Sequence, residues 1–126
     1  MHRPISTRTH GLIDYVYGVT LIAAPFVFGW GPEARRLSMA AGAVTLAASA
    51  MTNYEYGLVP VLSMKTHLAL DGAETSVLMS APARLRGSGD RSAAWVLALM
   101  GAAGAAVGAL TQPRSPREAL PRPAWT

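Results

Sequence analysis

Two histidine–aspartate pairs carry most of the chemistry that this sequence offers. His10 and Asp14 are four residues apart, and His67 and Asp71 have the same spacing. Residues at i and i+4 share one face of a helix, so each pair would present an imidazole beside a carboxylate. Imidazole nitrogen and carboxylate oxygen are ligands of divalent metal ions such as Zn²⁺. The four side chains therefore predict a metal site, provided that the fold brings the two pairs together.

Other interpretations of the same residues stay open. Glu74 lies seven residues after His67 and continues its face, as an additional ligand or a base. Two imidazoles would also suit haem ligation. A structural role is the leading interpretation and metal binding its alternative, because a buried carboxylate needs a hydrogen-bond partner and the other pair's histidine would supply one. A proton or solute carrier acting as an oligomer would instead use Asp14, Asp71 and Glu74 as titrating groups inside a membrane.

The two pairs belong to an internal repeat in which equivalent positions differ by a constant sequence offset of 57. The matches are Thr9 with Thr66, His10 with His67, Asp14 with Asp71, Leu21 with Leu78, Ala24 with Ala81 and Pro25 with Pro82. Further along, Gly42 and Gly104 align at an offset of 62. The pattern predicts a duplicated helix hairpin. Because each hairpin returns the chain to the side it left, the copies would be parallel, with both His–Asp pairs at one end.

Four helical segments are expected to position these residues, at about 9–30, 33–52, 61–82 and 92–111. The first is long enough to cross a hydrocarbon layer, and the last has no charged residue from Ser92 to Thr111. The third segment contains Lys65, Asp71 and Glu74, so it must be sheltered if it spans a bilayer.

Composition favours a membrane protein. Of 126 residues, 51% are hydrophobic and 14% charged, against roughly 25% charged in soluble domains. We expect an all-α, four-helix transmembrane bundle of two tandem parallel two-helix repeats over residues 1–111, with repeat 1 at about 7–53 and repeat 2 at about 61–111. The proline- and arginine-rich residues 112–126 are expected to form a disordered tail. The absence of cysteine excludes disulfides and thiolate ligands.

The net charge of +4 comes from arginines scattered between apolar segments, which indicates lipid headgroups and not nucleic acid as the partner. Gly104 and Gly108 form a small-residue face for internal helix packing or for a homo-oligomer. No phosphate loop, nucleophile elbow or His-Glu-x-x-His motif is present, so we expect no enzymatic activity.

The stretch from Arg8 to Tyr15, the run from Leu21 to Phe26 and their repeats resemble the SPW-repeat family of small bacterial integral membrane proteins. That family has two-helix units, each with a Ser-Pro-Trp-like tripeptide near the end of its first helix. Here the tripeptides are Ala24-Pro25-Phe26 and Ala81-Pro82-Ala83, so only the prolines match. The resemblance implies a membrane protein of bacterial origin, and it supplies no activity and no catalytic residue. The duplicated hairpin and the lack of catalytic motifs predict a multi-pass protein of the bacterial inner membrane with a structural or accessory role.

Overall fold

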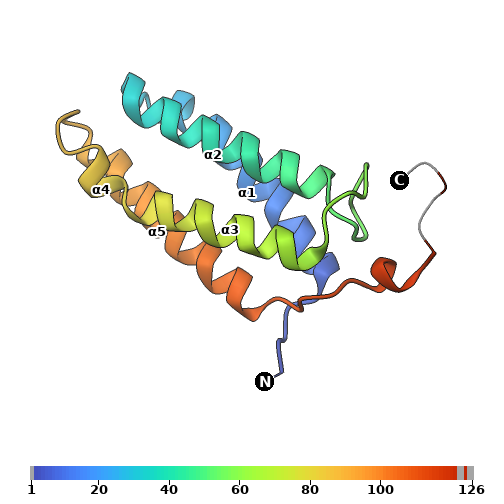
Figure 1. Ribbon diagram of the computed structural model, residues 1–126. Coiled ribbons are helices and arrows are strands. Elements are labelled where there is room, and N and C mark those ends of the chain that lie inside the picture. Colours follow the sequence, from blue (N-terminus) through green and yellow to red (C-terminus); the bar gives the residue numbers. More distant parts are fainter. Residues whose placement is uncertain (1, 122–123, 125–126) are drawn as a thin grey trace.

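Helices make up the regular structure of the computed structural model, which describes residues 2–121 and 124. No strand occurs within that part of the chain, so the prediction of an all-helical protein is confirmed. In chain order the elements are α1 (Thr7–Val27), α2 (Pro32–Ala50), α3 (Met64–Met79), the single turn α4 (Ala81–Arg84), α5 (Arg91–Leu110) and the 3-10 helix η1 (Pro116–Ala119) (Figure 1).

The helices pack as two pairs, α1 with α2 and α3 with α5 (Figure 1). The start of α1, the start of α3, the loop of residues 51–63 and the C-terminal segment gather at one end of the molecule. The opposite end holds the α1–α2 turn and the loop after α4. There the carboxylate of Asp90 accepts a hydrogen bond of 2.9 Å from the backbone N–H of Gly31. Helices α1 and α3 therefore run in the same direction.

Helices α1 and α3 begin at serine caps that occupy equivalent positions of the repeat, at the offset of 57. The hydroxyls of Ser6 and Ser63 each accept a hydrogen bond of 3.1 Å from a backbone N–H three residues later. Such a bond satisfies one of the free N–H groups in the first turn of a helix. The caps place the helix starts at Thr7 and Met64, two residues before and three residues after the starts expected from the sequence.

The two prolines at offset 57 have different effects on their helices. Pro25 lies inside α1 and leaves the carbonyl of Leu21 without its helical partner, but the hydroxyl of Ser38 donates to that carbonyl at 2.5 Å. Near Pro82 the helix instead ends at Met79 and restarts as α4. The segment 61–82, expected as one helix, is thus divided.

Each helix pair is in close contact at a glycine of its second helix. An added Cβ would come within 2.7 Å of the carbonyl oxygen of Gly18 at Gly42, and within 2.8 Å of that of Thr75 at Gly101. These equivalent glycines differ by an offset of 59, so the expected alignment of Gly42 with Gly104 at offset 62 is wrong by three positions. Residues three positions apart lie on nearly the same face of a helix. Both alignments therefore match small residues with small residues, and the apolar pattern alone does not distinguish the two offsets.

The C-terminal segment differs from the disordered tail expected for 112–126. Backbone hydrogen bonds join Ile5 to Leu110 (3.0 Å) and Gln112 to Ile5 (2.9 Å). Further on, Ser115 donates to the carbonyl of Asn53, and η1 begins at a capping box. The segment is held because these polar groups find partners in the 51–63 loop. Residues 122–123 and 125–126 of the expected tail lie outside the described residues.

Two helices, α1 and α5, are long and apolar enough to cross a membrane by length and composition. The face of α1 that points away from the protein is apolar, with Leu12, Val16 and Val19 all more than half exposed. Helix α5 similarly exposes Trp95 and Leu99.

Candidate metal centre

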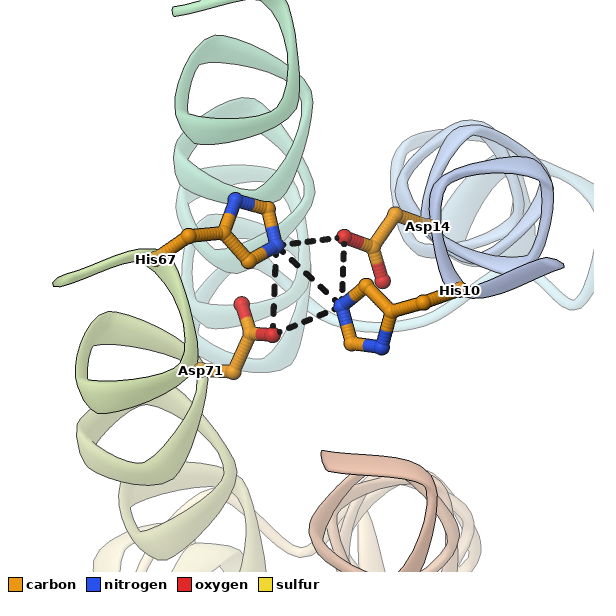
Figure 2. A group of neighbouring side chains, drawn as sticks. All are labelled: His10, Asp14, His67 and Asp71. Carbon is orange, nitrogen blue, oxygen red and sulfur yellow. Dashed lines mark hydrogen bonds and ion pairs between the residues drawn. The ribbon is translucent and has the colours of Figure 1, made fainter. Parts of the chain in front are cut away.

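The four predicted ligands meet in one cluster between α1 and α3 (Figure 2). His10 Nε2 lies 3.2 Å from His67 Nε2 and 3.1 Å from an oxygen of each aspartate. His67 Nε2 lies 2.8 Å from Asp14 Oδ2 and 3.3 Å from Asp71 Oδ2. All four ligand atoms are within 4.8 Å of one another. Each histidine thus contacts the aspartate of its own helix and that of the other helix.

Two threonines orient the imidazole rings. Thr52 lies 2.7 Å from His67 Nδ1, and its hydroxyl donates to the carbonyl of Ala48 at 2.6 Å. Thr111 lies 2.8 Å from His10 Nδ1 and donates to the carbonyl of Val107 at 2.7 Å. A hydroxyl has one proton, so when that proton is donated to the carbonyl, the threonine oxygen accepts from the Nδ1–H of the histidine.

This arrangement determines what the ring nitrogens offer to the centre. When Nδ1 carries the proton of a neutral imidazole, Nε2 presents a lone pair. The centre then contains two nitrogen lone pairs and two carboxylate oxygens, all of them acceptors. A metal-binding histidine commonly donates its other N–H in this way, because the bond fixes the tautomer and the ring orientation. With neutral histidines the two carboxylates give the cluster a charge that one divalent cation neutralises.

The cluster is shielded from solvent to different degrees on its two sides. The side chains of His10 and His67 are 2% and 0% exposed, that of Asp14 9%, and that of Asp71 12%. Asp14 Oδ2 also accepts a hydrogen bond of 3.1 Å from Ser49. Asp71 Oδ2 contacts the two histidines. The Oδ1 atoms of both aspartates make no hydrogen bond within the described part of the chain, and neither has a dashed line in Figure 2.

Glu74 lies near the cluster but outside the set of four. Both of its carboxylate oxygens approach the hydroxyl of Thr45, at 2.7 and 2.8 Å. A cavity of about 100 Å³ lies between Glu74 and the ligands, with Asp14 and Asp71 on its wall. Tyr17, the residue at the equivalent position of α1, donates instead to a backbone carbonyl of α5. The fold thus places Glu74 beside the metal ligands, across a small cavity.

The loop of residues 51–63 covers the cluster. Tyr54 is fully buried, with its ring centroid 5.8 Å from that of His67. Its ring occupies the space where Gly11 has no side chain, since a Cβ there would overlap a ring carbon. Burial raises the pKa of the Tyr54 hydroxyl above its ordinary value, so this group stays neutral. Glu55 accepts from the Thr7 hydroxyl at the start of α1 and so helps to hold the loop in place.

The sequence interpretation missed Thr52, Thr111 and Ser49. The first two differ by an offset of 59, so a search at offset 57 does not pair them. An offset of 59 for the second helices would have matched Thr52 with Thr111. Ser49 has no counterpart, because Gly108 occupies that position. Gly104, expected on a small-residue face, is half-buried and packs against Thr75 and Tyr17.

No family model, curated protein or solved structure matches this chain.

Proposed function

We propose that this protein is a small, non-enzymatic integral membrane protein that binds one divalent transition-metal ion, of the Zn²⁺ class, through His10, Asp14, His67 and Asp71. The observation that carries the proposal is the convergence of two histidine nitrogens and two carboxylate oxygens, within 4.8 Å of one another, in one buried cluster. Two nitrogens and two oxygens in a compact set suit a tetrahedral ion of this class. The role is structural or accessory, with the ion joining α1 to α3.

The interatomic distances favour an ion over haem. Ligands at about 2.0–2.2 Å from a tetrahedral ion lie roughly 3.3–3.5 Å apart. Five of the six contacts in the cluster measure between 2.8 and 3.3 Å, and the sixth, between the two aspartate oxygens, is the one for which the bound of 4.8 Å applies. A tetrahedral ion therefore requires the five contacts to lengthen by a few tenths of an ångström and the two carboxylates to approach each other. Haem between two axial histidines needs their nitrogens about 4 Å apart with a porphyrin in the plane between them. Here the carboxylates of Asp14 and Asp71 fill that plane.

The main alternative is a pair of ion pairs without metal. It requires a proton on each Nε2 atom, either in neutral imidazoles whose Nδ1 atoms accept from Thr52 and Thr111 or in imidazolium ions, so that two N–H groups face each other across 3.2 Å. A metal ion removes this close approach of two protons and gives every lone pair a partner. The same residues therefore serve binding better than they serve as structural glue.

Several features support membrane insertion of all four long helices. In the most apolar 18-residue stretches of α1 and α5, 39% and 22% of residues are buried, so much of the apolar surface of these helices faces outward. In water such a surface would favour association with other proteins, whereas in a membrane lipid would cover it. Helices α3 and α4 together cover residues 64–84, a length that suits a bilayer. Basic side chains lie near both ends: Arg3, Arg8, Lys65 and Arg114 at one, and Arg35, Arg36, Arg84, Arg86 and Arg91 at the other.

Duplication of one helix hairpin would account for the contacts that occur once in each helix pair. The serine caps, the histidines and the aspartates repeat at offset 57, while the threonines and the close-contact glycines repeat at offset 59. We therefore extend the resemblance to the SPW-repeat family into a proposal of a multi-pass protein of the bacterial inner membrane.

Metal analysis of the detergent-purified protein tests the proposal. We expect one equivalent of bound ion per chain after incubation with Zn²⁺ and removal of free ion. His10→Ala and His67→Ala should each weaken binding by more than about 100-fold, because a tetrahedral ion loses a direct ligand. Binding should also weaken as the pH falls through the imidazole range, since a protonated histidine cannot ligate.

His2→Ala is the matched control, because His2 is exposed and lies outside the cluster. It should bind Zn²⁺ as the unaltered protein does. Binding that survives His10→Ala and His67→Ala together would contradict the proposal. A metal-free protein that His10→Ala merely destabilises would support the ion-pair alternative, and recovery in the soluble fraction without detergent would refute membrane insertion.

A further inference from the structure

A groove of about 470 Å³ lies between the start of α3 and the C-terminal segment, at the end of the molecule where α1 and α3 begin (Figure 1). Ser63 and Lys65 line it from the side of α3, and Arg114, Ser115 and Glu118 line it from the C-terminal segment. We call it the basic groove. It is separate from the metal cluster, because none of the four proposed ligands lines it.

Hydrogen bonds hold the two sides of the basic groove together. The carboxylate of Glu118 accepts from the backbone N–H of Met64 at 3.1 Å and from that of Ser115 at 2.8 Å. Ser115 is buried, and its hydroxyl donates to the carbonyl of Asn53. The groove is therefore a fixed part of the fold. Its acidic side chain already has an N–H partner for each oxygen.

Two cations of the basic groove differ from the other basic side chains at this end of the molecule. Arg3 and Arg117 donate to backbone carbonyls, and Arg8 donates to a tyrosine hydroxyl. Lys65 and Arg114 are exposed, and they make no hydrogen bond or ion pair within the part of the chain that the structure describes. The cations without a protein partner are thus the two that line the same groove.

The chemistry of this pair suits a phosphate group. A guanidinium binds phosphate oxygens through two parallel N–H groups, and an ammonium binds them as a point charge. The loop that leads into the groove exposes the apolar side chains of Leu58, Val59 and Val61, which suit contact with lipid. In the orientation that membrane insertion of α1 and α5 would give, this end lies at the membrane surface, where lipid phosphates are concentrated.

We propose that the basic groove binds the phosphate group of an anionic phospholipid, with Lys65 and Arg114 holding the phosphate oxygens. The site goes beyond metal binding and does not depend on it. Membrane insertion enters only as the source of the phosphate, since the same two cations would also attract free phosphate.

Native mass spectrometry of the detergent-purified protein tests the site by counting bound lipid. Phosphatidylglycerol, which has a net negative charge, should bind as a single molecule per chain and at least about tenfold more tightly than zwitterionic phosphatidylcholine. Replacing both cations, by Lys65→Gln together with Arg114→Gln, should weaken phosphatidylglycerol binding by about tenfold or more. Added salt should weaken binding to the unaltered protein, because the pair is exposed.

The matched control is Arg86→Gln together with Arg91→Gln, which removes the same charge from exposed positions at the opposite end. It should bind phosphatidylglycerol as the unaltered protein does. If the control loses as much affinity as the groove variant, or if the groove variant loses none, the basic groove is not a lipid site.

Inorganic phosphate distinguishes the two sources of the ligand. Phosphatidylglycerol should stay bound in a large excess of inorganic phosphate, because its acyl chains add contacts that the free ion lacks. If inorganic phosphate displaces the lipid, the groove is a site for free phosphate and the assignment to lipid is wrong. The Zn²⁺ content of the groove variant, measured in parallel, should be unchanged, which separates this test from that of the metal cluster.

Discussion

The two helix pairs build the same kind of contact and differ in what surrounds it. In the α1–α2 half, Ser38 satisfies the carbonyl that Pro25 leaves free, and Ser49 holds Asp14. In the α3–α5 half, Leu97 and Gly108 stand where the other half has Ser38 and Ser49. Helix α3 ends at Met79, and no serine hydroxyl at position 108 donates to Asp71. Symmetry is therefore retained where four side chains meet and relaxed around them. One half thus has two serine contacts that the other half lacks.

The comparison indicates which contacts both halves require. The caps, the threonine hydroxyls and the close glycine contacts are each present twice. Removing either copy should therefore lower the stability or the metal affinity by a similar amount. The serines Ser38 and Ser49 are present once, so their loss should make the α1–α2 half resemble the α3–α5 half.

The largest effect is expected from the paired threonines. Thr52→Val and Thr111→Val each remove the oxygen that accepts from a histidine Nδ1–H, which should weaken metal binding by about 10–100-fold. Thr20→Val is the control, because its hydroxyl makes the same i−4 bond on an exposed face. Competition with a chromogenic chelator measures all three. Equal losses of metal affinity for Thr52→Val and Thr111→Val would support equivalent roles for the two threonines, whereas an effect confined to one variant would contradict them.

A smaller effect is expected at the close helix contacts. Gly101→Ala places a methyl group against the backbone of Thr75 and should lower the free energy of unfolding by about 2 kcal/mol. Gly42→Ala should cost about as much in the other half. On the same helix, Gly108→Ala meets no atom and should be neutral or slightly stabilising. Thermal or denaturant unfolding in detergent distinguishes these outcomes, and a Gly101→Ala protein as stable as Gly108→Ala would contradict the close packing.

The smallest effect tests the difference between the halves. Ser49→Ala removes one hydrogen bond from Asp14, which keeps its contacts with both histidines, so the stability should fall by about 1 kcal/mol. Ser76→Ala, which loses an exposed bond to a backbone carbonyl, is the control. If unfolding measurements give both variants the same stability, Ser49 does not hold Asp14 and the contrast between the halves is smaller than described.

Residue type and spacing were sufficient to predict that His10, Asp14, His67 and Asp71 meet in one cluster. His and Asp are scarce in this composition, so their agreement at one offset was informative. The second helices are rich in alanine and glycine, and there an alignment error of three positions left the apolar pattern intact. It also concealed the pairing of Thr52 with Thr111. The C-terminal segment was misjudged for another reason: its order depends on hydrogen bonds to a loop that is distant in the sequence, which composition does not encode.

The cross-connection of the two halves has a consequence for what a single hairpin can form. Thr52 of the first hairpin orients His67 of the second, and Thr111 of the second orients His10 of the first. The backbone bridges cross over in the same way, Ile5 with Thr111 and Thr52 with Leu62. A single hairpin lacks both partners, but two identical hairpins related by a two-fold axis would supply every contact. Two separate hairpin chains could therefore form the whole cluster as a homodimer, each supplying the threonine that orients the other's histidine.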